Sequence, residues 1–541
     1  MRSRAVVVLS VLGMSLVSGG WLLQKGMEDG GRVLDRARLF DDVFEHVSQF
    51  YVDSVPQSSL YEKAVDGLLR ELHDPHSVYL TGERLRRLTE STTGNYAGVG
   101  IQIDVRNGWI TVVSALPGTP AERAGLEGGD RIVAIDSVGT EGWSSDEASR
   151  VLRGPEGTRV VLTIERPGVA QRFPVPVQRR EIHVPSVQHA VMLEPGTGYI
   201  DLTVFSENSA EEIERAVERL RDQGMRELIL DLRDNPGGLL DQGVAVSDLF
   251  LDRGDMIVSM RGRTPDANRE FLDRAAQRWS GLPMVVLVNE NSASASEIVA
   301  GALQDHDRAV IVGRTSYGKG SAQSLFPLSG GGALKLTTAL WFTPVGRSIN
   351  KKLSDDDAEQ LALDLPEEVP SGERTPYRTE TGRTVYGGGG ITPDVAVSDS
   401  IRSAEELALT RALGTDVAKF RDALTAQAMS MKVSRAVRTP DFTIGPSTLD
   451  AFRERLERSD VAIADDLFDD SRDVITRLLT YEVARYVFGP EVEFLRRARS
   501  DDVVQTAVRL VKGAPSQQAL FERAQQYPTD VAQLQKSGGG R

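Results

Sequence analysis

Three serines separated by alanines lie at the expected start of a helix and are the first candidates for chemistry. The run Ser292-Ala293-Ser294-Ala295-Ser296 follows an apolar stretch, Val285–Val288, that predicts a buried strand, and it leads into an expected helix, Ser296–Leu303. Small side chains let a substrate backbone approach closely. Free N–H groups and the positive end of a helix dipole suit a developing negative charge on oxygen. The same run is also an ordinary helix cap, so chemistry requires a second group.

A single lysine between two glycines, Gly318-Lys319-Gly320, is that second candidate. It lies 25 positions after Ser294, beyond the expected helix and a further buried strand, Val310–Val312, so the chain can return it to the serine. Flanking glycines let backbone wrap the lysine and remove water from its ammonium group. The motif is not a phosphate-binding loop, which requires Ser or Thr directly after the lysine.

Composition excludes several other classes of function. Asp and Glu number 78 against 63 Lys and Arg, a net charge of −15, whereas a nucleic-acid binder needs a basic surface. The chain has no cysteine, which excludes disulfides and thiolate nucleophiles. His73 and His76 are separated by Pro75 and have no third ligand nearby, so we expect neither a metal site nor a cofactor.

The elements that must position Ser294 and Lys319 follow an α/β order. Between Tyr199 and about Val397, expected strands alternate with helices, and after about Ser400 the chain is predicted to be mostly helical. The strands and helix before the serine run are expected over Tyr199–Leu202, Ala210–Gln223 and Glu227–Leu232. A stripe near the C-terminus is typical of a packing helix and comprises Ile475, Leu478, Leu479, Val483 and Val487.

The segment from Asn95 to about Arg179 has short β-type runs and glycine turns. Strands are expected over Val99–Val105, Ile110–Val113, Arg131–Ile135 and Val160–Ile164, and helices over Ala121–Ala124 and Ser145–Leu152. The loop Tyr96-Ala97-Gly98-Val99-Gly100-Ile101, followed by Pro117–Ala121, Ala124–Leu126 and Gly129–Ile132, resembles a PDZ domain in order and spacing. The resemblance implies that Gly98, Val99, Gly100 and Ile101 bind a substrate's terminal carboxylate through backbone N–H groups.

The N-terminus has the pattern of an export signal. Arg2 and Arg4 precede an uncharged stretch, Ala5–Leu23, which is long for a signal-peptide core and just sufficient to span a bilayer. An uncleaved membrane anchor is slightly favoured over a cleaved signal. Both place the rest of the chain outside the cytoplasm, in the periplasm or cell envelope. Between Val33 and about Leu88, apolar residues such as Leu39, Val43 and Val47 recur at helical spacing.

Residues 35–397 as a whole resemble the carboxyl-terminal processing proteases, also called tail-specific proteases. Besides the PDZ segment and the two candidate motifs, the shared motifs are Asp74–Ser77, Leu232–Leu239, Lys335–Ala339, Pro344–Ile349 and Gly390–Asp394. The chain departs from the family pattern at Arg314, Ser316 and Trp341-Phe342. These departures put substrate preference in doubt and leave the chemistry intact.

The resemblance implies a role for each site residue. Ser294 corresponds to the nucleophile, Lys319 to the general base and Gln323 to the residue that orients the lysine. The backbone N–H groups of Ala295 and Gly238 correspond to the oxyanion hole, with Gly238 chosen over Gly237. A lysine that is half neutral at pH 7 needs its pKa lowered by ~3.4 units, or ~4.6 kcal/mol, and burial can supply that shift. Asp305 also matches an acidic position and is interpreted as structural.

The predicted fold is a multidomain α/β protein. It comprises a signal or anchor (1–24), an N-terminal helical domain (25–94), a β-rich PDZ domain (95–180), an α/β, crotonase-like serine–lysine protease core (181–399) and a mostly helical C-terminal extension (400–541). The predicted function is that of an extracytoplasmic serine endopeptidase acting on proteins or peptides with free C-termini. Membrane contact would run through residues 5–23 if the segment is uncleaved.

Three rival interpretations accompany this one. They are a Ser-His-Asp hydrolase with His306 as base, a catalytically silent PDZ scaffold and a crotonase-like acyl-CoA enzyme. His306 lies between Asp305 and Asp307 at an expected helix end, a favourable place for a solvated charge. The sequence does not choose whether residues 400–541 self-associate, cover the active site or bind an adaptor. It also leaves open the physiological substrate and whether the PDZ domain activates or inhibits.

Overall fold

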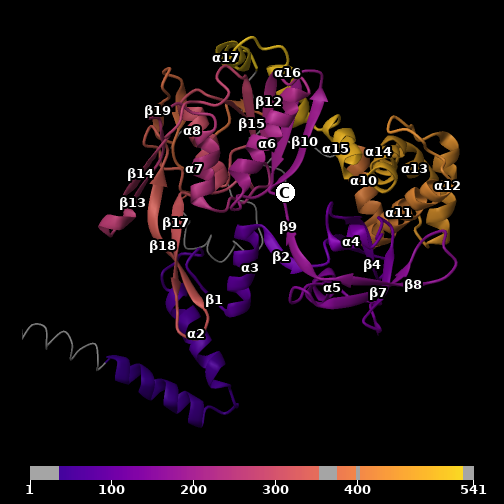
Figure 1. Ribbon diagram of the computed structural model, residues 1–541, viewed down its shortest axis with the longest axis horizontal. Helices are drawn as coiled ribbons and strands as arrows, with labels where there is room; N and C mark the ends of the chain where they lie inside the picture. The colour runs from indigo at the N-terminus through magenta and orange to yellow at the C-terminus, as the bar shows by residue number, and fades with distance from the viewer. Residues whose placement is uncertain (1–35, 352–373, 398–402, 528–541) are drawn as a thin grey trace, which may run out of the picture. The chain divides into compact units, whose positions relative to one another are not determined.

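The computed structural model describes residues 36–351, 374–397 and 403–527 (Figure 1). The expected signal or anchor, residues 1–24, lies outside this part of the chain. Among the described residues, no helix is long and apolar enough to cross a membrane. The chain divides into two compact units: residues 1–82 with 323–337, and residues 83–322 with 338–541.

The first unit joins segments that are far apart in sequence. Residues 36–50 and α2 (Gln57–Arg70) are helical, and they are followed by β1 (Val78–Leu80). Strand β1 pairs antiparallel with the start of β18 (Ala333–Phe342), and β17 (Ser321–Pro327) also pairs with β18. The apolar stripe of the first helix is exposed, since Leu39, Val43 and Val47 keep 64%, 55% and 40% of their surface accessible.

The PDZ segment of the second unit forms its own sheet and core. Its strand order is β3-β4-β5-β7-β8, with β6 paired to β5, and α5 (Ser145–Leu152) packs on the same core as Val99. Ser144 caps α5 and exchanges hydrogen bonds with Glu147. The other elements are β2 (Asn95–Gly98), β3 (Ile101–Arg106), β4 (Trp109–Ala115), α4 (Pro120–Arg123), β5 (Arg131–Ile135), β6 (Val138–Gly139), β7 (Arg159–Glu165), β8 (Phe173–Gln178) and β9 (Arg180–His183).

The protease core is built on a six-stranded sheet of order β10-β11-β12-β15-β16-β21. The pair β10–β11 is antiparallel, and every neighbouring pair from β11 to β21 is parallel. The strands are β10 (Val187–Glu194), β11 (Thr197–Leu202), β12 (Glu227–Asp231), β15 (Met284–Val288), β16 (Val310–Gly313) and β21 (Val395–Ala396). The four strands that the sequence predicts in this sheet form here, with ends shifted by a few residues.

Successive side chains of the central strands point alternately into two apolar layers, one on each face of the sheet. On one face, α6 (Ser209–Asp222), α7 (Leu240–Asp248) and α8 (Ala295–Asp305) pack against residues such as Leu230 and Val286. On the other face, α16 (Asp502–Val511) and α17 (Gln517–Gln525) pack against residues such as Ile229 and Val285. Figure 1 shows these helix groups beside the sheet. The last helices of the chain are therefore part of the protease core.

A second, antiparallel sheet borders α8 and was not predicted from the sequence. Strand β13 (Met256–Gly262) pairs with β14 (Arg269–Leu272) and with the second half of β18. The short elements nearby and beyond are α3 (Gly82–Thr93), η1 (Pro265–Ala267), β19 (Pro376–Arg378) and β20 (Thr384–Tyr386).

The helices between residues 404 and 498 form two apolar clusters of their own, and residues 494–498 also pack on the layer that contains α16 and α17. They are α10 (Ala404–Leu413), η3 (Gly414–Asp416), α11 (Val417–Val433), α12 (Pro446–Arg458), α13 (Asp465–Asp470), α14 (Arg472–Val483), η4 (Ala484–Phe488) and α15 (Pro490–Ala498). The predicted stripe on α14 and η4 is confirmed as a packing surface, because Ile475, Leu479 and Val483 have no exposed surface. Helix α11 contacts the PDZ segment, where Asp422 accepts from the backbone N–H of Asn107 at 3.0 Å.

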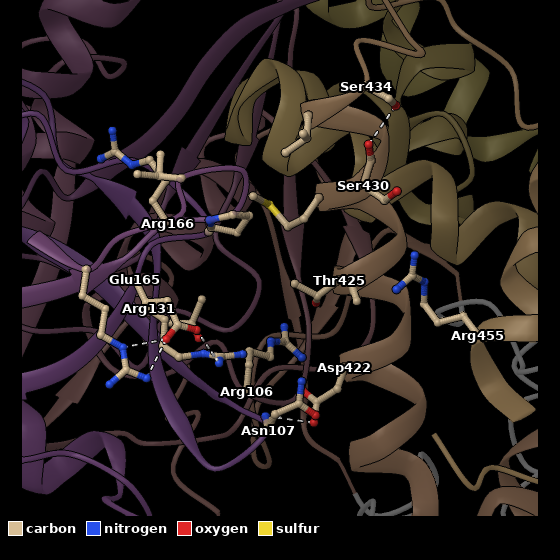
Figure 2. A pocket seen from close by; sticks show the side chains of 18 of the residues that line it. Arg106, Asn107, Arg131, Glu165, Arg166, Asp422, Thr425, Ser430, Ser434 and Arg455 are labelled. Carbon is tan, nitrogen blue, oxygen red and sulfur yellow. Dashed lines mark hydrogen bonds and ion pairs between the residues drawn. The ribbon is translucent and has the colours of Figure 1, made fainter. Parts of the chain in front are cut away.

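A hollow of about 800 Å³ lies between α11 and the PDZ strands (Figure 2). Arginines line it, but most already have carboxylate partners, such as Arg131 with Glu165 at 3.0 Å and Arg166 with Asp130 at 2.6 Å. This neutralisation leaves no concentrated positive charge, and we assign no chemistry to the hollow.

Candidate active site

Three neighbouring parallel strands deliver the candidate residues to one edge of the sheet. Strand β12 leads into the loop 232–239, β15 into 289–294 and β16 into 314–320. Carboxyl ends of adjacent parallel strands meet at the same edge, which is where open α/β sheets form their sites. Hydrogen bonds cross between the loops, from Ser292 Oγ to the Leu232 carbonyl (2.7 Å) and from the Tyr317 N–H to the Ser292 carbonyl (3.0 Å).

The three serines of the run have different surroundings. Ser292 and Ser296 are fully buried, and their hydroxyls donate to the backbone carbonyls of Leu232 and Asn235 at 2.7 and 2.9 Å. Ser294 is partly exposed and is the N-cap residue of α8. Its backbone lies at φ 56° and ψ −112°, a region that a residue with a side chain rarely adopts. Such strain costs about 1–3 kcal/mol and occurs mainly at functional sites.

Glu297 forms hydrogen bonds with both the loop 289–294, which contains Ser294, and the loop 314–320, which contains Lys319. One carboxylate oxygen accepts from Ser316 Oγ and the Gly318 N–H, both at 2.6 Å. The other accepts from the backbone N–H groups of Ser294 at 2.8 Å and Lys319 at 3.0 Å. The residue has no exposed surface, and burial raises the pKa of its carboxyl, although the four hydrogen bonds act in the opposite direction. A single side chain thus sets the spacing of the Ser294 and Lys319 backbones.

The backbone around Lys319 is fixed from several sides. Its carbonyl accepts a hydrogen bond from the Trp341 indole at 3.1 Å. The preceding Gly318 has φ 91°, and a Cβ there would lie 3.0 Å from the Gly390 nitrogen, so only glycine fits this approach. The lysine itself is half-buried. The two glycines therefore allow the close wrapping that the sequence predicts.

The Asn-Pro-Gly-Gly turn lies against the serine. A Cβ on Gly237 would come 2.8 Å from Ser294 Cβ and 2.9 Å from the Ala295 nitrogen. The Gly237 N–H is already used, donating to Asn235 Oδ1 at 2.9 Å. Within the described residues, neither the Gly238 N–H nor the Ala295 N–H donates to a protein acceptor. The two N–H groups predicted for an oxyanion hole thus have no protein acceptor in the described part of the chain, and Gly237, which precedes Gly238, lies against Ser294.

Gln323 belongs to the other compact unit. There its side-chain amide donates to Thr337 Oγ1 at 3.2 Å, and the Thr337 N–H in turn donates to Ser77 Oγ at 3.0 Å. The orienting role of Gln323 toward Lys319 stays a prediction.

His306 lies at the wrong end of α8 to serve Ser294. It follows the last residue of the helix, while Ser294 precedes the first, and eleven residues of α-helix span about 16 Å. The His306 ring contacts the Met256 carbonyl at 2.7 Å and Glu380 at 3.2 Å. Its neighbour Asp305 is buried in an ion pair with Arg347, in agreement with its predicted structural role. This geometry disfavours the Ser-His-Asp alternative.

The predicted carboxylate loop, Gly98–Ile101, connects β2 to β3. The carbonyls of Val99 and Gly100 accept from Ala121 and Leu116, both at 3.0 Å, which fixes the turn. Strand β3 begins at Ile101 and stands at one end of the sheet order. An edge strand beside such a loop is the arrangement that adds a peptide as a further strand.

Sequence reasoning missed the residues that hold the loops in place. Asp234, at φ 57°, accepts from the side-chain amides of Asn289 and Asn291 at 2.9 and 2.8 Å. The Asn235 carbonyl accepts from the Ala293 N–H at 3.0 Å. Glu297 was also missed, although a carboxylate in an otherwise apolar helix start is a visible signal that a buried partner exists.

Comparison with known proteins agrees with this arrangement. Residues 196–359 match Peptidase family S41, residues 111–166 match the PDZ domain family, and residues 23–84 match the activating protease CtpB N-terminal domain. The carboxy-terminal-processing protease of Bartonella bacilliformis is 43% identical over 57% of this chain and 71% of its own length. The carboxy-terminal processing protease CtpA of Bacillus subtilis is 32% identical over 69% of this chain and 77% of its own length.

Solved structures are also similar. The photosystem II D1 C-terminal processing protease has 28% sequence identity and a TM-score of 0.35, and the match covers 70% of this chain and 97% of that one. The PDZ domain of the carboxy-terminal protease from Vibrio cholerae, in complex with peptide, has 26% identity and a TM-score of 0.16 over 16% of this chain and 98% of that one.

The two family models and the curated relatives define a serine-type peptidase with a PDZ domain, a combination that implies binding of peptide substrates. The chain belongs to Peptidase family S41, among the carboxy-terminal processing proteases. The predicted family and fold class are thereby confirmed.

Proposed function

We propose that the chain hydrolyses peptide bonds by a serine–lysine mechanism outside the cytoplasm and selects substrates by their free C-termini. The observation that carries the mechanism is the placement of Ser294. It is the one partly exposed serine of the run, it faces the Gly237–Gly238 turn, and Glu297 links its backbone to that of Lys319.

The chemistry follows in two steps. Neutral Lys319 takes the proton of Ser294 Oγ as that oxygen attacks the peptide carbonyl, and the N–H groups of Gly238 and Ala295 stabilise the resulting oxyanion. The leaving amine takes the proton from Lys319, and water then hydrolyses the acyl-enzyme. Gln323 orients the lysine with a neutral amide, because a carboxylate would stabilise the lysine cation and oppose its role as a base.

The mechanism is tested by comparing three serine variants. Ser294→Ala should abolish hydrolysis of a C-terminal peptide substrate and leave the thermal midpoint nearly unchanged, since the hydroxyl serves chemistry. Ser292→Ala and Ser296→Ala should keep measurable turnover, because their hydroxyls only hold backbone carbonyls. An inactive Ser296→Ala beside an active Ser294→Ala would show that the nucleophile is misassigned. Full activity of Ser294→Ala would refute Ser294 as the nucleophile, whereas absence of hydrolysis by the wild-type chain would favour the silent scaffold.

Recognition of C-termini is supported by the edge strand β3 and the loop Gly98–Ile101. Backbone N–H groups of such a loop bind a carboxylate but gain nothing from an amide at the same position. We therefore expect that amidating the C-terminus of an apolar-ended substrate reduces cleavage at least tenfold. Matched acid and amide peptides in one assay measure this effect. Equal rates for the two forms would contradict recognition through the PDZ loop.

The proposed location derives from Arg2, Arg4 and the uncharged stretch Ala5–Leu23. We expect the full-length chain to fractionate with the cell envelope and a chain lacking residues 1–24 to stay in the cytoplasm. Recovery of the full-length chain in the cytoplasm would refute the location. If salt alone extracts the full-length chain from the envelope fraction, the membrane anchor is refuted and a cleaved signal is favoured.

A further inference from the structure

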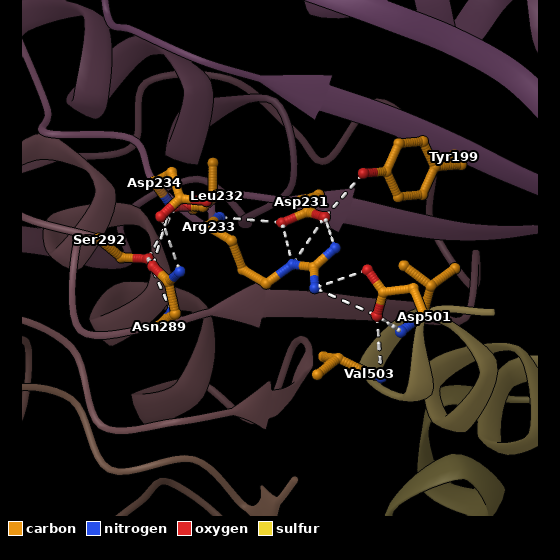
Figure 3. Close-up of polar contacts among 10 residues, drawn as sticks. Tyr199, Asp231, Leu232, Arg233, Asp234, Asn289, Ser292, Asp501 and Val503 are labelled. Atoms are coloured by element: carbon orange, nitrogen blue, oxygen red, sulfur yellow. Dashed lines mark hydrogen bonds and ion pairs between the residues drawn. The ribbon is translucent and has the colours of Figure 1, made fainter. Parts of the chain in front are cut away.

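The helical extension places one carboxylate against the oxyanion loop of the protease. Asp501, the N-cap residue of α16, contacts Arg233, which directly precedes the loop Asp234–Gly238 (Figure 3). The distances from Arg233 Nη1 to the two carboxylate oxygens of Asp501 are 2.9 and 3.2 Å. The sequence separation is 268 residues, so this contact exists only after the extension has packed on the core.

The guanidinium of Arg233 forms ion pairs with two carboxylates. Its Nε and Nη2 face Asp231 at the end of β12, at 3.0 and 2.7 Å, while Nη1 faces Asp501. The side chain of Arg233 is only 14% exposed and that of Asp231 only 4%. In such a site a guanidinium–carboxylate pair is weakly screened and geometrically specific.

Asp501 is itself held rigidly. One of its oxygens accepts from the N–H groups of Val503 and Val504, both at 3.0 Å. Both valines are buried in the apolar layer that joins α16 to the central strands. The carboxylate is therefore fixed to the core by the helix that it caps.

The loop Asp234–Gly238, which follows Arg233, carries the proposed oxyanion donor. Asp234 accepts hydrogen bonds from the side chains of Asn289 and Asn291. Asn235 accepts hydrogen bonds from the backbone N–H groups of Gly237 and Ala293. A displacement of Arg233 would pass through this network to the Gly238 N–H. Donors in an oxyanion hole must be aligned before the reaction, because they act on charge that develops only in the transition state.

We propose that Asp501 is a positioning residue of the peptidase, which aligns the oxyanion loop through Arg233. This inference rests on the proposed serine mechanism and gives the C-terminal extension a part in catalysis. In this proposal Asp501 acts on the loop through the Arg233 guanidinium.

The test replaces Asp501 by residues that separate its two contacts. Serine is a good N-cap but is too short to reach Arg233, so Asp501→Ser keeps the helix and loses the contact. We expect kcat to fall about tenfold with KM unchanged within twofold, less than the 10²–10³-fold cost of removing an oxyanion donor outright. Asp501→Asn keeps one oxygen that can accept from the Val503 and Val504 N–H groups, but it loses the charge and one of the two acceptor oxygens that face Arg233, so its kcat should fall by an intermediate factor of about threefold. If Asp501→Ser does not fold, Asp501→Asn tests the proposal by itself. The proposal then requires that kcat of Asp501→Asn falls by this intermediate factor while KM stays constant.

The matched control is Ser516→Ala. Ser516 caps the next helix, α17, by accepting from the Ala519 N–H at 3.2 Å, and it lies outside the described partners of Arg233. Its loss should lower the thermal midpoint and leave kcat unchanged. A wild-type kcat in Asp501→Ser, an effect on KM alone, or an equal loss of kcat in Ser516→Ala would each overturn the proposal.

Amide hydrogen exchange gives a reading that does not depend on hydrolysis. Residues 232–240 should exchange faster in Asp501→Ser than in wild type and should be unchanged in Ser516→Ala. Unchanged exchange in Asp501→Ser overturns the inference whatever the activity. Hydrolysis that survives Ser294→Ala overturns the serine mechanism instead, while faster exchange at residues 232–240 in Asp501→Ser would still support the positioning role of Asp501.

Discussion

At the scale of single residues, the groups proposed to react, Ser294 and Lys319, are distinct from Glu297, which sets the spacing of their backbones. Glu297 faces four donors from two loops and is fully buried, so its carboxylate is committed to backbone geometry. Ser294 carries the backbone strain, at φ 56°. The hydrogen bond from its N–H to Glu297 is one of the contacts that can offset the cost of that conformation.

Lys319 is the residue on which the proposed mechanism most depends. Arginine keeps the positive charge but does not lose its proton in a protein, so Lys319→Arg should be as inactive as Lys319→Ala. The wild-type rate should rise with pH through one ionisation well below that of a free lysine. Initial rates between pH 6 and 10 measure both effects. Near-wild-type activity of Lys319→Arg would indicate electrostatic stabilisation in place of base catalysis.

At the scale of elements, the turn after β12 is packed too closely for any side chain. A Cβ on Gly237 would lie 2.6 Å from the Ala293 carbonyl oxygen as well as against Ser294. Overpacking of this kind costs about 1–3 kcal/mol and shifts backbone, and here the displaced atoms belong to the nucleophile loop. We expect Gly237→Ala to reduce kcat more than 100-fold.

Gly254 provides the control for this prediction. Its φ of 96° is close to the 93° of Gly237, but a Cβ there would meet no atom within 4 Å. The backbone penalty of alanine at positive φ is therefore shared by the two variants, and the steric clash is not. Gly254→Ala should keep kcat within about twofold. Similar kinetics for the two variants would show that the turn tolerates displacement.

Elements specified by local signals were predictable from the sequence. Strand Arg131–Ile135 and helix Ser145–Leu152 form with the predicted bounds, because alternation and a capping serine are encoded within a few residues. Strand β1 was missed, since its pairing depends on β18, about 250 residues later. The stripe containing Leu39 predicted the helix correctly, but periodicity alone does not ensure burial.

In the candidate site, too, features specified by local sequence were predictable and features that depend on tertiary packing were not. The positions of Ser294 and Lys319 after two parallel strands follow from the order of elements and from the motifs. The convergence of Glu297 on both loops depends on tertiary packing, as does the contact of Asp501 with Arg233. Neither has a local sequence pattern.

At the scale of the whole molecule, a half-buried carboxyl near the end of β11 links stability to pH. Burial, together with the negative charge of Asp231, raises the pKa of Asp201 to about 7. The folded state therefore binds more protons than the unfolded state between about pH 4 and 7, and stability should fall as the pH rises through this range. The cost above pH 7 amounts to as much as about 4 kcal/mol.

Asp201→Asn should remove this dependence. The variant cannot ionise, so its thermal midpoint should exceed that of wild type by a few degrees at pH 8 and approach it at pH 4. Thermal melts across this range measure the difference. Asp222→Asn, at an exposed position at the end of α6, should not raise the midpoint at pH 8 in this way. A midpoint of Asp201→Asn below wild type at pH 8 would contradict the assignment.

The pairing of β1 with β18 also has a consequence for biosynthesis. Val78 finds its partner in Lys335, so the helices of the first unit are complete long before the strand that joins their sheet has been made. At about 5–20 residues per second, the ribosome needs on the order of 10–50 s to supply that partner. During this interval, the nascent chain exposes the edge of β1 next to apolar side chains of residues 36–50 that are exposed in the complete structure as well. A chaperone that binds the emerging N-terminal segment would act within that window.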